Sequence, residues 1–259
     1  MTLMVTVLLA LMLLSPCVSL NYILESNDRV LFVGHMNAML GSLPHGFVNI
    51  FGREANSVLQ NVSVFTAGAE ANLDLLVKLD TLLDHYKPTI VVVSLGIEAF
   101  SGRGTLESLG EIKYEVESIV ARLLQEGQKV ILCPMAFSGE RTDSSNGLDE
   151  VLGEYAQVNK QIARDYAVMG VNLSNEVGRY LQANNVDNQQ HSVLTLEGSV
   201  LNERGHMLAA LVLLRALGVT GHSLASDDLL VQEERRVQAL KRELSRVAPL
   251  DLESVDVSI

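Results

Sequence analysis

Short apolar runs alternate along this chain with longer segments in which apolar and polar positions recur at helical spacing. Five of the apolar runs, rich in β-branched residues, are predicted strands: 29–34, 62–68, 89–96, 129–135 and 167–174. The run TIVVVSLG at 89–96 is almost uniformly apolar, which is typical of a strand covered on both faces.

The intervening segments predict helices at 71–86, 112–126, 148–166 and 206–217. The clearest is ANLDLLVKLDTLLDHY at 71–86, in which leucines recur at three- and four-residue spacing. Gly127 follows the second of these helices, where glycine is a common C-terminal cap. The repeated alternation predicts an α/β fold, a three-layer α/β/α sandwich around a central, mostly parallel five-stranded sheet.

The chain has 259 residues, 48% of them hydrophobic, so it can bury a full core, and we expect one domain over residues 28–219. The formal net charge of −12 argues against nucleic acid and against anionic membrane surfaces as partners.

The first residues predict a signal peptide. An apolar run at 3–14 is followed by Pro16 and by small residues up to Ser19, so we expect a signal over 1–19, cleaved near Ser19, although no Lys or Arg precedes the run. The run is shorter than the roughly 20 residues that span a bilayer, so no membrane span is expected after cleavage. The mature chain is then secreted or lumenal in the secretory pathway; the alternative is an uncleaved N-terminal anchor.

Two Asn-x-Ser sequons, at Asn61 and Asn172, fit this route and are candidate glycosylation sites. Cys17 would leave with the signal, so Cys133 has no partner in the mature chain. Cys133 lies in the apolar run KVILCPM, which predicts a buried structural thiol.

The acidic tail at 222–259 differs from the domain before it. It contains a predicted helix at 226–247, capped by Ser226–Asp228 and ended by Pro249. Its apolar residues follow heptad spacing over too few turns to predict a coiled coil. We expect this helix to pack on the domain or on a protein partner.

Candidate chemistry is sought where the strands end, because ligands of open parallel sheets bind beyond the carboxyl ends of the strands. The first three predicted strands lead into GHMN (34–37), Gly68 and GIEA (96–99). The final helix is preceded by LEGSVLNERGH (196–206), in which His206 is expected to order the loop.

Across roughly residues 28–218, the chain resembles the SGNH, or GDSL, hydrolase superfamily. The resemblance rests on TAGAEANLDLLVKLDTLLDHYKPTIVVVSLG (66–96), on LNERGH (201–206), and on the order and spacing of the elements. It implies a flavodoxin-like fold and an ancestral ester-hydrolase activity of the esterase or lipase type. It also implies that Gly34 is the family's nucleophile-turn glycine and Gly68 its oxyanion glycine.

At the other catalytic positions, the resemblance implies substitutions. His35 and Met36 stand where the family has Asp and its nucleophilic Ser, and Glu98 stands where it has the oxyanion Asn. Glu197 replaces the triad Asp, and Val200 replaces the general-base His.

These substitutions remove the family's chemistry. The thioether of Met36 has no proton to lose and cannot form an acyl-enzyme. Val200 supplies no base, and an ionised Glu98 has only acceptors where an oxyanion needs a donor. Loss of a triad nucleophile or base lowers the rate by up to roughly a million-fold.

We therefore expect a pseudoenzyme that acts as a binding or interaction module, with no intact catalytic residue. Its cleft would hold a glycan, an acyl group or a peptide, and the candidate cleft residues are His35, Met36, Asn37, Gly68, Glu98 and Ser199. No cofactor is expected. A metal set of His35, Glu98, Glu197 and His206 has suitable ligands but no HxxxH or HExxH spacing, so no metal is expected either.

Two alternatives remain open at this stage. In the first alternative, the chain is an active carboxylic ester hydrolase or acyltransferase with displaced residues, such as Ser199 or a His35–Glu98 dyad. In the second, it is a structural protein that assembles through helix 226–247.

Overall fold

The structure, a computed structural model, describes residues 23–35, 46–69, 71–95, 108–143 and 145–219. The predicted signal at 1–19 and the predicted tail helix at 226–247 lie outside these residues. Within the described ranges, every helix is too short or too polar to cross a bilayer.

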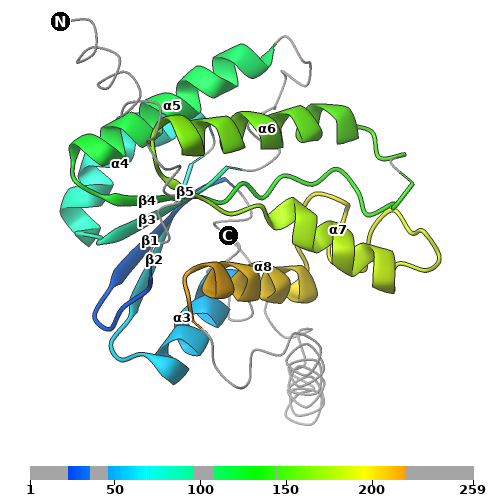
Figure 1. The fold of residues 1–259 in the computed structure, drawn as a ribbon, viewed down its shortest axis with the longest axis horizontal. Coiled ribbons are helices and arrows are strands. Elements are labelled where there is room, and N and C mark those ends of the chain that lie inside the picture. The colour runs from blue at the N-terminus through cyan, green and yellow to red at the C-terminus, as the bar shows by residue number, and fades with distance from the viewer. Residues whose placement is uncertain (1–22, 36–45, 70, 96–107, 144, 220–259) are drawn as a thin grey trace, which may run out of the picture. The chain divides into compact units, whose positions relative to one another are not determined.

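Five parallel strands form one sheet among the described residues (Figure 1). They are β1 (Arg29–Gly34), β2 (Ser63–Gly68), β3 (Ile90–Ser94), β4 (Lys129–Leu132) and β5 (Met169–Gly170). Their order in space is β2-β1-β3-β4-β5, the flavodoxin-like order of doubly wound folds. This confirms the predicted parallel sheet.

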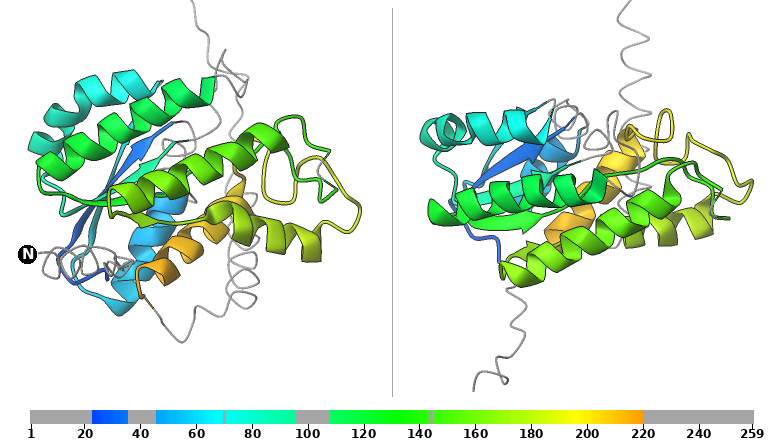
Figure 2. Two further views of the ribbon diagram at one scale, coloured as in Figure 1. Left: turned by 45° about the horizontal axis from the view of Figure 1, so that its top comes forward. Right: turned by 90° about the horizontal axis from the view of Figure 1, so that it is seen from above.

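Six described helices cover the sheet: α3 (Phe47–Val58), α4 (Asn72–Tyr86), α5 (Leu109–Gln125), α6 (Asp149–Asp165), α7 (Leu173–Asn184) and α8 (Glu203–Ala216). Helices α4, α5 and α6 cover one face, and α3 and α8 pack together on the other (Figures 1 and 2). The predicted three-layer α/β/α sandwich is confirmed.

The alternation of side chains along β1 shows why the central strands are apolar throughout. Leu31 and Val33 face the core shared with α4, α5 and α6. Phe32 points to the opposite layer, where its ring meets Phe47 and Phe51 of α3 edge to face, with centroids 5.1 and 5.3 Å apart. Successive side chains of a strand point to opposite faces, so a strand covered on both sides needs apolar residues at every position.

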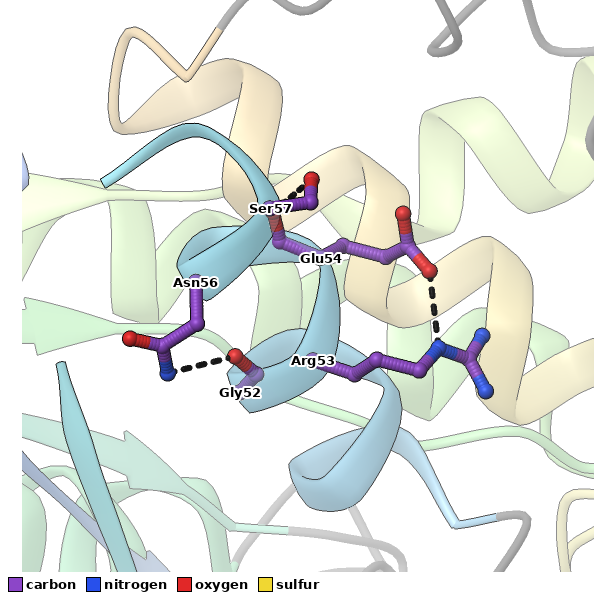
Figure 3. A network of polar contacts seen from close by, with 5 residues as sticks. All are labelled: Gly52, Arg53, Glu54, Asn56 and Ser57. Atoms are coloured by element: carbon purple, nitrogen blue, oxygen red, sulfur yellow. Dashed lines mark hydrogen bonds and ion pairs between the residues drawn. The ribbon is translucent and has the colours of Figure 1, made fainter. Parts of the chain in front are cut away.

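The turn from α3 into β2 is fixed by one side chain. Asn56 donates from Nδ2 to the carbonyl oxygen of Gly52 at 2.9 Å (Figure 3). Its Nδ2 also donates to Val62 O at 2.8 Å, and its Oδ1 accepts from Val62 N at 2.9 Å. Gly52 itself allows α3 to lie close to β2, because a Cβ there would lie 2.8 Å from Cγ2 of Val64.

Two features differ from the sequence prediction. The strand predicted at 167–174 is reduced to Met169–Gly170, and the chain turns into helix α7 at Leu173. Neither α3 nor α7 was predicted. Cys133 is buried as expected, and burial raises the pKa of its thiol to about 12, so it is an unreactive thiol at neutral pH.

Candidate functional site

Three strand ends meet at the corner after β1. Gly34 pairs with Gly68 on one side and with Ser94 on the other. A Cβ on Gly34 would lie 1.8 Å from the carbonyl oxygen of Ser94, so only glycine fits at this position. Ala69 N donates to Gly34 O at 2.8 Å, which holds the chain after β2 against the corner.

His35 continues from this corner and is buried, with 1% of its surface exposed. Its backbone N donates to Ser94 O at 3.4 Å. The next predicted cleft residues, Met36, Asn37 and Glu98, lie outside the described residues, so a contact between His35 and Glu98 stays a prediction.

The segment before α8 forms a short hairpin. Thr195 and Leu201 form an antiparallel bridge, and Leu196 N donates to Val200 O at 2.8 Å. Gly198 turns the chain with φ +87°, a conformation that favours glycine. Glu197 is exposed beside this turn, and Ser199 and Val200 are half-buried.

The hairpin lies toward the carboxyl end of the sheet. Leu24, just before β1, donates its N–H to Leu217 O at 3.0 Å, so α8 ends at the amino edge. The first turn of α8, and the hairpin that leads into it, are therefore toward the carboxyl edge. The corner at Gly34 and the hairpin with Glu197 and Val200 share this edge.

His206 packs between helices, and its predicted role in ordering the loop before α8 stays a prediction. It lies in the first turns of α8, 6% exposed, and its ring stacks on Phe47 of α3 with centroids 6.0 Å apart. Burial lowers its pKa to about 4, so the imidazole is neutral at neutral pH. Nδ1 has no hydrogen-bond partner among the described residues.

Ser94 is a buried polar residue that sequence reasoning did not single out. It ends β3 on the same face as Phe32, because Gly34 is its partner and Phe32 pairs with Val92 two residues earlier. Its Oγ is buried and lacks a hydrogen-bond partner within the described part of the chain. The available signal was one hydroxyl at the carboxyl end of an otherwise apolar strand.

Asn72 was also missed. It is the first residue of α4, is 1% exposed, and donates from Nδ2 to Glu115 Oε2 on α5 at 2.8 Å. The two helices that follow the strand ends at Gly68 and Ser94 are thus joined by a buried polar bond. Oδ1 of Asn72 has no partner in the described residues, which leaves an acceptor at the start of α4.

The two sequons lie at opposite edges of the sheet. Asn61 is exposed in the turn before β2, with φ 59°. Asn172 is exposed beyond β5, where its Oδ1 caps α7 by accepting from Asn175 N at 3.2 Å. A glycan at Asn172 would therefore stand at the carboxyl edge, and one at Asn61 would not. Whether either sequon is used stays a prediction.

Within the described ranges, no group of three or more His, Cys, Asp or Glu side chains is arranged to hold a metal ion. The buried polar atoms of Ser94 and Asn72 are suited to hydrogen-bonding a neutral ligand or water.

No protein-family model matches the chain, and no curated protein matches its sequence. Solved structures do match its fold. The acetyl xylan esterase AlAXEase matches with a TM-score of 0.67 and 22% identity, over 73% of this chain and 98% of the esterase. The acetylxylan esterase Axe2 from Geobacillus stearothermophilus gives 0.62 and 18%, over 75% of this chain and 95% of its own.

A G-D-S-L family protein from Desulfitobacterium hafniense matches with a TM-score of 0.56 and 14% identity, over 74% of this chain and all (100%) of that one. At these identities the likeness establishes the fold, the SGNH-type α/β/α fold that the sequence predicted, and does not transfer an activity.

Proposed function

We propose that this chain is a non-hydrolytic member of the SGNH hydrolase superfamily that acts in the secretory pathway by binding a ligand in the cleft at the carboxyl edge of its sheet. One observation carries the proposal. The glycine corner and the hairpin are both built, and the resemblance assigns to Met36 and Val200 the positions that the family uses for its nucleophile and its base.

Val200 is the described residue that supports the loss of hydrolysis most directly. Its carbonyl oxygen accepts from Leu196 N, so the hairpin keeps its backbone bonds while the side chain offers no proton acceptor. Without a base, neither a serine nor a water is activated by the family route. A scaffold that keeps this shape without the chemistry is suited to binding.

A glycan is the ligand that we place first, ahead of an acyl group or a peptide. Two of the solved structures with this fold are esterases of acetylxylan. The hydrogen-bonding atoms of Ser94 and Asn72 are neutral, as are the hydroxyl and acetyl groups of such a polysaccharide. The net charge of −12 disfavours anionic ligands.

The test is direct. The purified mature chain is incubated with p-nitrophenyl acetate and with a serine-reactive fluorophosphonate, and its binding to acetylated and deacetylated xylo-oligosaccharides is measured by calorimetry. We expect binding without turnover and without labelling. Turnover or labelling that Ser199→Ala or His35→Gln abolishes would refute the proposal in favour of an active hydrolase with displaced residues.

The secretory route needs its own experiment. The full chain is expressed with its native N-terminus in a eukaryotic secretory host, and the product is sequenced and treated with an N-glycosidase. We expect a new N-terminus near residue 20 and a mass shift that Asn61→Gln or Asn172→Gln reduces. A chain that keeps Met1 and stays in the cytosol contradicts this part of the proposal.

A further experiment tests the alternative that the chain assembles through its tail. Size-exclusion chromatography of the chain with and without residues 222–259 should give the same oligomeric state. A state that changes with the tail favours a structural protein that acts through helix 226–247.

A further inference from the structure

Glu140 is a buried acidic residue in the loop that follows β4. Only 1% of its surface is exposed, and no Lys or Arg in the described residues forms an ion pair with it. A carboxylate buried without a cation is costly unless hydrogen bonds satisfy its oxygens.

Those hydrogen bonds come from one short segment. The backbone N–H groups of three consecutive residues point at the carboxylate: Val193 donates to Oε2 at 2.8 Å, Leu194 donates to Oε1 at 2.8 Å, and Thr195 also donates to Oε1. The Thr195 hydroxyl adds a fourth bond to Oε1 at 2.6 Å. Consecutive N–H groups that converge in this way form an anion-binding nest, and here the anion belongs to the chain itself.

The backbone of Glu140 is tied to the same region. Its N–H donates to Gln190 O at 3.0 Å, and its carbonyl accepts from Asn185 Nδ2 at 2.7 Å. Figures 1 and 2 show the loop after β4 and the loop before α8 side by side beyond the sheet. The Glu140 carboxylate, with its four hydrogen bonds, joins the two loops.

The nest is linked to the hairpin by Thr195. The Thr195 hydroxyl, which donates to Glu140, also accepts from Gly198 N at 3.0 Å, and Thr195 is one half of the bridge that closes the hairpin. The Thr195 hydroxyl therefore connects the turn beside Glu197 to the Glu140 carboxylate.

The nest is linked to α8 by Leu194. The Leu194 carbonyl accepts from Asn202 N at 2.9 Å, and a Cβ on Gly205 would lie 2.2 Å from that oxygen. The start of α8 thus lies directly against the segment that binds Glu140.

We propose that Glu140 is a built-in ligand whose carboxylate positions the hairpin at 195–201, and with it the Glu197 and Val200 side of the cleft. The part about the cleft rests on the proposed function; the assignment of the nest does not.

The first experiment measures local opening by hydrogen exchange in the full-length chain. Glu140→Gln keeps the size of the side chain but places an amide NH₂ against N–H donors. We expect the amides of 193–195 to exchange about 10- to 100-fold faster than in the parent, with β1 and β3 unchanged. Glu154→Gln, which changes an exposed acid on α6, is the matched control and should not alter exchange.

The second experiment is chemical rescue. Glu140→Ala leaves space for a small anion, so sodium acetate should restore protection at 193–195 and raise the melting temperature, and sodium chloride at equal ionic strength should not. Glu140→Gln, whose amide fills the space, should not respond. A residue that served only as filler would show no rescue.

Wild-type exchange at 193–195 in Glu140→Gln overturns the proposal, and so does a folded Glu140→Ala that does not respond to acetate. If Glu140→Ala fails to fold in chloride, its refolding in acetate supports the proposal. If it folds in neither salt, the exchange rates of Glu140→Gln decide. None of these measurements needs the cleft ligand, so a failure here is distinct from a failure of the proposed function.

Discussion

Ser94 and His206 each bury a polar atom without a hydrogen-bond partner in the described residues, in the layers around α3 and α8. An unmade bond of this kind costs about 1–3 kcal/mol. Such atoms are kept where a water or a ligand completes them, or where the group serves in its neutral form. His206 is of the second kind, because its ring lies flat on Phe47 and is neutral.

The neutrality of His206 predicts acid sensitivity. Its folded pKa, about 4, lies below the ordinary value of 6.5, so its contribution is fully present above pH 6.5 and is lost as pH falls toward 4. At pH 4.5 this loss is about 2–3 kcal/mol of unfolding free energy. Urea denaturation of the parent and of His206→Phe at a series of pH values should therefore show the parent losing more unfolding free energy on acidification than the variant. Parallel curves for the two proteins contradict the prediction.

Substitution of glycine by alanine is expected to have opposite effects on stability at Gly34 and at Gly153. Gly34→Ala would place a Cβ 1.8 Å from a backbone oxygen, and we expect a loss of more than about 3 kcal/mol or a failure to fold. Gly153, within α6, has no atom within 4 Å of the position that an added Cβ would take, so Gly153→Ala should stabilise by about 1 kcal/mol. Thermal unfolding of both variants tests the pair, and a tolerated Gly34→Ala would show that the corner relaxes.

At the scale of elements, the junction between α3 and β2 depends on Asn56, which makes three hydrogen bonds to backbone groups on both sides of the turn. Because this one amide joins Gly52 in the helix to both backbone groups of Val62 just before the strand, its loss leaves the Val62 groups without these partners. The edge strand β2 then loses its fixed entry point.

We expect Asn56→Ala to lower the unfolding free energy by about 1–3 kcal/mol. Asn184→Ala, which removes a single exposed bond from Nδ2 to Tyr180 O at 2.9 Å, is the matched control and should cost less than about 0.5 kcal/mol. Equal losses in urea denaturation would show that the Asn56 bonds do not act together.

Elements with a strong pattern were predictable from sequence, and those with a weak pattern were not. The leucine spacing of 71–86 gave α4 to within a residue, observed at Asn72–Tyr86. Helix α7 buries only Leu173, Val177 and Leu181, a narrow stripe within a polar segment, so its periodicity is faint. Helix α3 contains Gly52, which lowers helix propensity but is needed for contact with β2.

The candidate site divides in the same way. The glycine corner at Gly34 and Gly68 follows from strand patterns and from the resemblance, and the structure joins the two. The Glu140 nest was not predictable, because its partners lie more than fifty residues away and are backbone N–H groups, which leave no trace in side-chain identity.

At the scale of the whole molecule, the proposal predicts that activity can be restored. A variant carrying Met36→Ser, Glu98→Asn and Val200→His regains a nucleophile, an oxyanion donor and a base on a fold that retains the glycine corner. We expect it to hydrolyse p-nitrophenyl acetate at least about a hundredfold faster than the parent. The control carries Ala in place of Met36 with the other two changes. A folded triple variant no faster than this control contradicts the assignment of these positions.

The hydrogen bond between Leu24 and Leu217 has a consequence for the engineering and evolution of the domain. It brings the first and last described segments together at the amino edge of the sheet, opposite the proposed cleft, as is common where a domain tolerates permutation or insertion. A short linker from residue 219 to residue 23, with new ends opened at the exposed turn around Gly127, would leave every strand neighbour unchanged. We therefore expect such a permuted chain to form the same sheet, because the fold depends on which segments are adjacent and not on the order in which the chain connects them.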